Sequence, residues 1–338
     1  MEDLTPADPR RIGGIDLHGR LGRGGMGQVY LGTTEDGERV AVKRLLETHA
    51  DRDDLRVRFD REIAAMRMVQ GPGTAALLDA ASPDDDDPWL AMEFVPGLPL
   101  KDHVQRHGTL NASSGIALAL VLADALAEIH AAGMLHRDLK PSNVLMGPEG
   151  PRVIDFGLVA LGAPGGEYTA TNAQLGTPVC MAPEQAGTPD KVTAAADVHG
   201  LGATVLFALT GHYPYKGSTM PELVGALTNP AVSPDLDGVP DDVKHQIGRM
   251  LAHDPADRPT LDRIRPELVE RLAGYGQSPA AARVDLARRT YTPQADDLDD
   301  RPLARRPRRS RRSAPQVSLS AELPVVRRTA ERLRRAYA

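Results

Sequence analysis

The stretch that decides the fold reads HRDLKPSN at residues 136–143, and DFG follows it at residues 155–157. Between short apolar runs, this region holds one ammonium, one carboxamide and two carboxylates, namely Lys140, Asn143, Asp138 and Asp155. Phosphoryl transfer needs groups that neutralise phosphate charge and a carboxylate that orients the attacking hydroxyl. The carboxylate and carboxamide oxygens also suit Mg²⁺, a hard ion that takes few ligands from protein. The region therefore predicts a site for phosphate and a divalent metal.

Both motifs resemble those of the protein kinase family, whose catalytic loop reads HRDxxxxN and whose metal loop reads DFG. The lysine two residues after Asp138 looks like the serine/threonine branch of that family, and the motifs together resemble the bacterial eukaryotic-like serine/threonine kinases. The resemblance implies an α+β fold with two lobes, a small N-lobe of antiparallel sheet plus one helix and a larger, mainly helical C-lobe. It further implies that ATP binds between the lobes with Mg²⁺ or Mn²⁺. By the same resemblance Asp138 and Lys140 are catalytic, and Asn143 and Asp155 hold the metal.

A glycine-rich segment and a lysine precede these motifs. Gly22, Gly24 and Gly27 lie in an alternating pattern that predicts a β-hairpin, and glycines let backbone N–H groups approach phosphate oxygens. A dinucleotide-binding fold is the commonest alternative, but it requires a helix directly after the glycines, whereas residues 28–31 (QVYL) favour a strand. No GxxxxGK[ST] motif occurs, which disfavours a P-loop NTPase. By resemblance this is the kinase glycine-rich loop, and Lys43 is the catalytic lysine of the next strand.

Residues 51–70 place Leu55, Phe59, Ile63 and Met66 at helical spacing, which predicts an amphipathic helix. By resemblance Glu62 on this helix pairs with Lys43 and holds it against the nucleotide phosphates. The resemblance also implies a set of ATP contacts, in which the backbone of the hinge meets the adenine: Leu21, Gly22, Gly24, Gly27, Val29, Ala41, Lys43, Met92, Glu93, Val95 and Leu145.

The residues between Asp155 and Glu184 resemble a complete activation segment that ends in APE. By resemblance, Arg137 belongs to a basic pocket that pairs with a phosphate on this segment. Thr169 and Thr171 are the candidate autophosphorylation sites. Four positions are implied to be structural, with Asp197 steadying the catalytic loop and Arg258 pairing with the APE glutamate: Thr177, Glu184, Asp197 and Arg258.

One position departs from the family pattern. Cys180 stands where relatives usually carry an aromatic residue, next to the expected position of the phosphoacceptor, so substrate preference cannot be carried over from the family. Cys180 is also the single cysteine of the chain, which excludes an internal disulfide and favours a reducing compartment. The N-terminus has no apolar core typical of a signal peptide, and the longest apolar runs fall short of the roughly 18 residues of a membrane span. We therefore expect a cytoplasmic protein without a transmembrane segment.

Charge divides the chain. Residues 277–338 hold 15 arginines and 7 acidic residues, whereas the rest of the chain is acidic. A basic tail could touch acidic surfaces, including anionic membrane, nucleic acid or the acidic body itself. The expected organisation is a disordered N-terminus, a kinase domain with two lobes, and a basic linker or tail with a possible terminal amphipathic helix: residues 1–11, 12–274 (N-lobe 12–95, C-lobe 96–274) and 275–338.

The expected function is transfer of the ATP γ-phosphate to serine or threonine hydroxyls of proteins in cytoplasmic signalling, with autophosphorylation of the activation loop. Expected partners are protein substrates, domains that read phosphothreonine, and a second copy of the chain for trans-autophosphorylation. Two alternatives remain open: a pseudokinase scaffold, and a small-molecule phosphotransferase of the aminoglycoside kinase type, which lacks the segment 176–184. A nucleic-acid-binding regulator acting through the tail is a lesser possibility.

Overall fold

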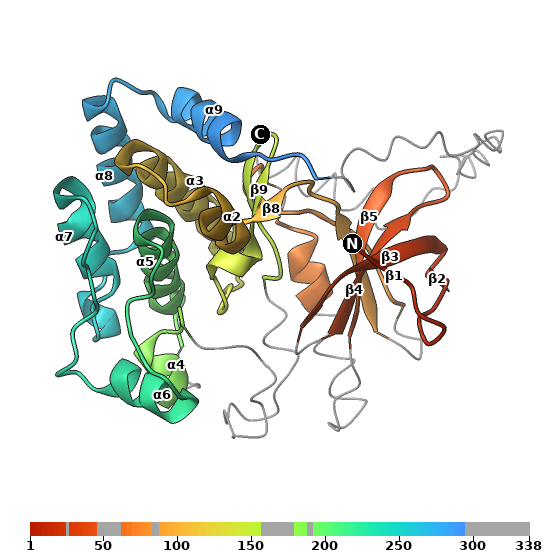
Figure 1. Ribbon diagram of the computed structural model, residues 1–338, viewed down its shortest axis with the longest axis horizontal. Coiled ribbons are helices and arrows are strands. Elements are labelled where there is room, and N and C mark those ends of the chain that lie inside the picture. Colours follow the sequence, from red (N-terminus) through yellow and green to blue (C-terminus); the bar gives the residue numbers. More distant parts are fainter. Residues whose placement is uncertain are drawn as a thin grey trace, which may run out of the picture. The chain divides into compact units, whose positions relative to one another are not determined.

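A computed structural model of the chain describes residues 1–24, 27–45, 62–69, 71–82, 88–156, 179–187 and 192–294. These residues belong to a unit of residues 1–299, whereas residues 300–338 form a second unit that contains none of them. The first unit has a sheet-rich N-terminal lobe and a helical C-terminal lobe (Figure 1).

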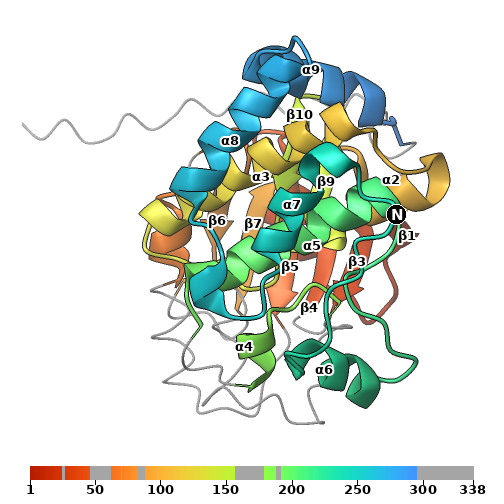
Figure 2. The ribbon, with the colours of Figure 1, turned by 90° about the vertical axis from the view of Figure 1, so that its left-hand side faces the viewer.

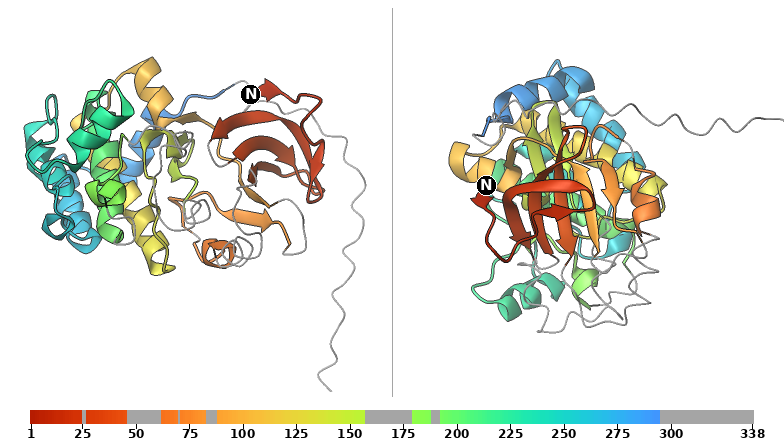
Figure 3. Two further views of the ribbon diagram at one scale, coloured as in Figure 1. Left: turned by 90° about the horizontal axis from the view of Figure 1, so that it is seen from below. Right: turned by 90° about the vertical axis from the view of Figure 1, so that its right-hand side faces the viewer.

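The N-terminal lobe is built on an antiparallel sheet with the strand order β1-β3-β4-β5-β7-β6, and β2 also pairs with β3 (Figure 3). Because strand side chains alternate between faces, Val40 and Val42 of β5 are fully buried on one face while Ala41 and Lys43 belong to the other. The strands are β1 (Glu2–Asp3), β2 (Arg11–Ile12), β3 (Ile15–Gly24), β4 (Gly27–Thr33), β5 (Arg39–Leu45), β6 (Leu77–Ala80) and β7 (Trp89–Glu93).

Residues 62–66 are helical and pack against this sheet. Met66 is fully buried, and it shares one core cluster with Met92 of β7 and with Phe156, the residue that follows Asp155. The helix that carries Glu62 is therefore in the same core as the metal-loop phenylalanine.

A second, smaller sheet joins the two lobes, with the order β10-β9-β8. Its strands are β8 (Leu98–Pro99), β9 (Val144–Gly147) and β10 (Gly150–Val153), and the 3-10 helix η1 (Pro141–Asn143) directly precedes β9. The catalytic-loop motif thus leads into β9, and DFG follows β10.

The C-terminal lobe packs its helices around α3 and α5, with α8 and α9 against α3 and α7 against α5 (Figure 2). Leu118, Leu122, Leu126 and Ile129 of α3 are fully buried, and each side chain of this kind contributes roughly 2 kcal/mol through burial. The helices are α2 (Leu100–His107), α3 (Ala112–Ala131), α4 (Pro183–Gly187), α5 (Ala194–Thr210), α6 (Met220–Thr228), α7 (Asp241–Met250), η5 (Pro255–Asp257), α8 (Leu261–Gly274) and α9 (Pro279–Thr290).

The helix α3 is long and apolar enough to cross a membrane, but 72% of its most apolar window is buried inside the protein. The expectation that apolar runs fall short of the roughly 18 residues of a membrane span therefore holds for uninterrupted runs, but not for the helix α3 as a whole. Such burial is typical of the core helix of a folded domain.

The structure corrects the expected disorder of residues 1–11. β1 pairs with β3, and the Asp8 carboxylate accepts hydrogen bonds from Thr5 Oγ1 at 2.7 Å, Arg20 Nη2 at 2.9 Å and Tyr30 OH at 2.9 Å. These contacts are polar, and two of them come from the strands β3 and β4, so hydrophobic periodicity could not reveal them.

The structure also corrects the linker expected after Gly274. Ser278 caps α9 by accepting from the backbone N–H of Ala281 at 3.3 Å, and Leu286 is fully buried. The buried face of α9 consists of a few small or apolar residues among arginines. The sequence pattern alone therefore did not indicate a core helix, and only the packing against α3 shows it. Residues 295–338 lie outside the described residues, so their expected linker and terminal helix stay predictions.

Candidate active site

The buried carboxylate of Asp197 on α5 holds the catalytic loop in place. Its two oxygens accept from the backbone N–H of Arg137 at 2.7 Å and of His136 at 2.9 Å, and His130 Nε2 lies 2.7 Å from Oδ2. Burial acts to raise the pKa of Asp197, but the hydrogen bonds from His130 and the two backbone groups keep that pKa below its ordinary value. These bonds compensate for the left-handed backbone of Arg137, whose φ is 64°, a conformation that costs a non-glycine residue energy.

Two polar side chains of the loop contact Asp138. Lys140 Nζ lies 2.7 Å from Asp138 Oδ2, and Asn143 Nδ2 donates to the Asp138 carbonyl at 2.8 Å. The Asp138 side chain is 40% exposed, so a hydroxyl group can reach its carboxylate from solvent. One short loop therefore holds a carboxylate that can accept a proton, Asp138, next to the ammonium group of Lys140.

The hairpin of β9 and β10 brings Asn143 to the metal loop. Val144 opens β9 and pairs with Val153, which closes β10. The residues just outside this pair must therefore lie at the same end of the hairpin, and Ile154 N–H donates to the Asn143 carbonyl at 3.0 Å. Asp155 follows directly, with a φ of 61° that turns it out of the strand.

Lys43 reaches this end of the hairpin from β5. Its ammonium lies 3.0 Å from Asp155 Oδ2, and the residue is only 5% exposed. A buried ammonium needs an opposite charge nearby because its desolvation is costly. Asp155 provides that charge in this structure.

In the part of the chain that the structure describes, Lys43 is paired with Asp155 and not with Glu62, so the expected pairing of Lys43 with Glu62 stays a prediction. Among the described residues Lys43 is the one buried lysine, and Asp155 compensates its charge. Burial raises the pKa of the half-buried Glu62, against the opposing charge of Arg137. The positive charge of Arg137 thus acts on Glu62, and the catalytic role of Glu62 stays a prediction.

The predicted adenine-site side chains of the N-lobe lie on one sheet face. The strand pairing places Leu31 opposite Ala41 and Ala41 opposite Met92, and it places Val29 opposite Lys43. Paired residues have their side chains on the same face, so Val29, Ala41, Lys43 and Met92 line a common surface.

The hinge follows directly after Met92. The Glu93 N–H donates to the Ala76 carbonyl at 2.8 Å, so this N–H is already used within the sheet. Val95 is buried beyond it. Leu145 lies in β9 opposite Pro99, in the small sheet that joins the lobes.

The described residues of the predicted glycine-rich loop lie at the end of β3 and the start of β4. Gly22 pairs with Val29 and Gly24 pairs with Gly27, and Leu21 lies in the same strand β3. A Cβ at Gly27 would lie 2.1 Å from the Arg44 carbonyl. Gly27 is therefore required for the close approach of β4 to β5 at the tip of the loop.

Behind the catalytic loop, Arg258 and Glu184 form a bidentate ion pair, with Nη1–Oε1 at 2.7 Å and Nη2–Oε2 at 2.8 Å. The Arg258 side chain is fully buried and also donates to the carbonyls of Ala252 and Ala195. The pair ties the end of the activation segment to α5 and η5. Thr169, Thr171 and Thr177 lie outside the described residues, so their predicted roles remain predictions.

Two residues of the site escaped sequence reasoning. Gln185 Nε2 donates to the Arg137 carbonyl at 2.7 Å and its Oε1 accepts from the Ala182 N–H at 3.0 Å, so it holds Arg137 from the side opposite Asp197. His130 binds Asp197. In the sequence, Gln185 could have been found only by its position next to Glu184. His130 could have been found only by its position six residues before HRD.

The donor set fits a hard divalent cation. Asn143 uses its amide nitrogen on Asp138, which leaves its oxygen as a ligand, and Asp155 uses one oxygen on Lys43. In the described part of the chain no three His, Cys, Asp or Glu side chains cluster closely enough to hold a metal. A cation here would take its protein ligands from Asn143 and Asp155 and the rest from water and phosphate, as Mg²⁺ commonly does.

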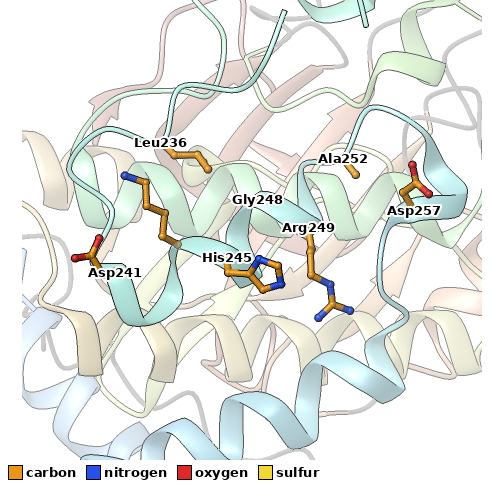
Figure 4. Close-up of a pocket in the computed structure, with 8 residues that line it drawn as sticks. Leu236, Asp241, His245, Gly248, Arg249, Ala252 and Asp257 are labelled. Atoms are coloured by element: carbon orange, nitrogen blue, oxygen red, sulfur yellow. The ribbon is translucent and has the colours of Figure 1, made fainter. Parts of the chain in front are cut away.

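A groove on α7 is separate from this site. Lys244, His245 and Arg249 line it together with Leu236, and no predicted catalytic or nucleotide-contact residue is among the side chains around it (Figure 4). The groove therefore has no part in the chemistry assembled around Asp138.

Comparison with known proteins agrees with this arrangement. The family model described as "Protein kinase domain" matches residues 15–267. The serine/threonine-protein kinase AfsK of Streptomyces coelicolor is 44% identical over 276 residues, which is 82% of this chain and 34% of AfsK. The probable serine/threonine-protein kinase PkwA of Thermomonospora curvata is 40% identical, over 79% of this chain and 35% of PkwA.

One solved structure is also similar. It is the crystal structure of Rad53 1-466 in complex with AMP-PNP, with a TM-score of 0.63 and 25% identity, covering 76% of this chain and 66% of that one. The chain spans about a third of the length of the curated relatives AfsK and PkwA.

Proposed function

This chain belongs to the protein kinase domain family, and on that premise we propose that it transfers the γ-phosphate of ATP to serine or threonine hydroxyls of protein substrates. The lysine two residues after Asp138 and the names of AfsK and PkwA, both serine/threonine-protein kinases, support serine and threonine as the acceptors. The relatives are longer than this chain, so the full set of substrates and partners belongs to the proposal as well.

One observation carries the proposal. The hairpin of β9 and β10 places Asn143 beside the DFG aspartate, and Lys43 of the other lobe is 3.0 Å from that aspartate. Asp138 and Lys140 lie on the same loop as Asn143. The fold thus brings together a carboxylate for the acceptor hydroxyl, two lysines for phosphate charge and two oxygen ligands for a cation.

In this mechanism the chain contributes position and charge more than covalent chemistry. Asp138 accepts a hydrogen bond from the acceptor hydroxyl and takes its proton, and Lys140, 2.7 Å from Asp138, is close enough to balance charge on the transferred group. Asn143 and Asp155 would hold Mg²⁺ or Mn²⁺, which neutralises phosphate charge when bound. The backbone of Glu93 and Val95 would fix the adenine.

Lys43 changes partner in the proposed cycle. Its buried ammonium is compensated by Asp155 in this structure. During transfer Lys43 would leave Asp155, contact phosphate oxygens and pair with Glu62, while Asp155 would hold the metal.

We further propose that phosphorylation of Thr169 or Thr171 promotes activity. Arg137 is exposed on the catalytic loop, and its positive charge attracts the Glu62 carboxylate. A phosphate that binds Arg137 would weaken this attraction and leave Glu62 free to pair with Lys43. A second copy of the chain would supply the phosphate in trans, and partner domains that read phosphothreonine could then bind. The cytoplasm is the proposed location because ATP is supplied there.

The test is phosphate transfer by the purified chain with Mg²⁺, ATP and a generic acceptor protein, followed by identification of the modified residues. Asp138→Asn should lower the rate by about 100-fold or more, because the general base is lost. Asp262→Asn, on the exposed first turn of α8, is the matched control and should leave the rate unchanged.

Other outcomes would identify the alternatives. ATP binding without transfer in the unaltered chain would indicate a pseudokinase scaffold. Transfer to aminoglycoside-like small molecules but to no protein would indicate a small-molecule phosphotransferase. Equal rates for the unaltered chain and Asp138→Asn would reject the proposed mechanism.

A further inference from the structure

The helix α9 lies beyond residues 15–267 that match the kinase domain, yet it belongs to the packed core. Ala282 and Leu286 are buried in the same cluster as side chains of α3 and α5. The helix contacts α3, α8, β9 and β10 (Figures 1 and 2). Its side chains are therefore held in fixed positions relative to the small sheet that leads to the metal loop.

Arg283 on α9 binds two backbone carbonyls that are far apart in the sequence. Its Nε donates to the Glu149 carbonyl at 3.3 Å, and its Nη2 donates to the Pro72 carbonyl. Glu149 lies in the turn between β9 and β10, whereas Pro72 lies in the segment 71–76 that joins the Glu62 helix to β6. One guanidinium group thus connects α9 to both lobes.

The backbone is shaped to receive this arginine. Gly150 has a φ of +119°, and a Cβ at that position would lie 3.2 Å from Arg283 Nε. Any other residue would be strained and would crowd the guanidinium. Burial and the neighbouring Arg152 lower the pKa of Arg283, while the carboxylates of Glu149, Asp124 and Glu128 oppose that shift, so the side chain remains a charged donor.

The segment 71–76 is bonded to β10 as well. Val153 N–H donates to the Gly73 carbonyl at 2.7 Å, and Ala75 N–H donates to the Val153 carbonyl at 3.0 Å. Arg152 Nη1 donates to the Thr74 carbonyl at 3.4 Å. The segment is therefore fixed on one side by the strand that ends two residues before Asp155, and on the other side by Arg283.

We propose that Arg283 is a positioning residue for the nucleotide site, which acts through the Pro72 carbonyl on the segment 71–76 and so on the helix that carries Glu62. Residues outside the matched kinase domain then bear on phosphate transfer, because the placement of Glu62 depends on the segment that follows its helix. The inference rests on the proposed kinase function. Arginine suits the role because its planar fork can serve two carbonyls at once, which a lysine cannot.

The experiment compares steady-state kinetics of the full chain with those of Arg283→Met, Arg283→Lys and Arg288→Met. Arg288 lies on the exposed face of the same helix and is the matched control. Arg283→Met should lower kcat by about tenfold, in the range of couplings carried by such contacts, with a smaller change in KM for the acceptor protein. Arg283→Lys should recover part of kcat, and Arg288→Met should behave as the unaltered chain.

Hydrogen exchange provides a readout that does not depend on activity. Amides of residues 62–69 and 71–76 should exchange faster in Arg283→Met than in Arg288→Met, because the segment loses one attachment. If Arg283→Met does not fold, the comparison of Arg283→Lys with Arg288→Met gives the same test with a smaller difference.

The proposal is overturned if kcat and the exchange of both segments are the same in the Arg283 variants as in Arg288→Met. A lower unfolding temperature with unchanged kcat and exchange would also overturn it, since that result describes a purely structural arginine. An unaltered chain without kinase activity would instead defeat the proposed function. In that case the exchange experiment would still decide whether Arg283 positions the segment.

Discussion

One buried histidine contacts the backbone just before the APE motif. His199 on α5 is fully buried, its Nδ1 lies 3.4 Å from the Cys180 carbonyl, and its ring is stacked on Tyr215 at 6.3 Å between centroids. The nearby charge of Arg258 also disfavours a second positive charge. Burial, aided by Arg258, lowers the pKa of His199 to about 3.

This shift makes stability depend on pH with a definite sign. The pKa of His199 is lower in the folded protein than its ordinary value of 6.5, so the unfolded chain takes up a proton first as pH falls. The contribution of neutral His199 to the free energy of unfolding is fully present above about pH 6.5 and is lost progressively as the pH falls. At about pH 5 the loss is about 2 kcal/mol. The loss is measured by denaturant unfolding of the unaltered chain and of His199→Asn, each at about pH 7 and about pH 5.

The change of the unfolding free energy with pH in the two proteins separates the effect of His199 from that of the other histidines. His199→Asn keeps a donor for the Cys180 carbonyl and cannot titrate in this range, so its stability should fall less between the two pH values. Parallel pH profiles for the two proteins would show that His199 is not the group responsible.

At the scale of elements, both ends of the described chain are fixed by contacts that reach across the fold. The N-terminal strands β1 and β2 pair with β3, which carries the first glycines of the glycine-rich loop. The helix α9 covers α3 and supports the hairpin β9–β10. Each element therefore lies against one that carries site residues.

The packing of α9 predicts a measurable contribution to stability. Leu286 is fully buried whereas Val284 on the same helix is 54% exposed. Leu286→Ala should lower the free energy of unfolding by about 2 to 5 kcal/mol, through lost burial and the cavity left behind. Val284→Ala should change it by no more than about 0.5 kcal/mol.

Chemical denaturation of the full chain measures both variants. A chain that ends after Gly274 should be destabilised in the same direction as Leu286→Ala. Equal stability of the two substituted chains would mean that α9 is not part of the cooperative fold.

At the scale of the whole folded unit, the two lobes share contacts at the site. The core cluster of the N-lobe includes Ile129, Met134 and Phe156 from the C-lobe side of the chain, and the Lys43–Asp155 pair joins the two sides. A ligand that binds both sides should therefore stabilise the unit as a whole.

Mg²⁺ with a non-hydrolysable ATP analogue should raise the unfolding temperature. At about 100 times the dissociation constant, binding contributes about 2.7 kcal/mol, which corresponds to roughly 5 °C for a unit of this size. Chelation of the metal should remove most of the shift, because the oxygens of Asn143 and Asp155 repel phosphate unless a cation lies between them.

Asp155→Asn is the variant that tests the metal ligand. It should bind the nucleotide with little dependence on Mg²⁺, since one charged oxygen ligand is lost. A metal-dependent shift of the same size in Asp155→Asn and in the unaltered chain would contradict the assignment of Asp155.

The motifs HRDLKPSN and DFG predicted the family and the two-lobed fold, and the family match and the structure confirm both. This was possible because the residues of each motif lie within a few positions of one another, so the motif is complete in the local sequence. Local patterns could also predict the glycine-rich hairpin, since its turn and its strands are neighbours in the chain.

Other features depended on residues that meet only in the folded protein. Lys43 is buried beside Asp155 instead of Glu62, the carboxylate of Asp8 collects donors from three places, and Arg283 binds Pro72 across the fold. Sequence periodicity reports which residues are apolar, but not which charge will compensate another. That choice is made by desolvation and distance, which exist only once strands and helices far apart in the chain are packed together.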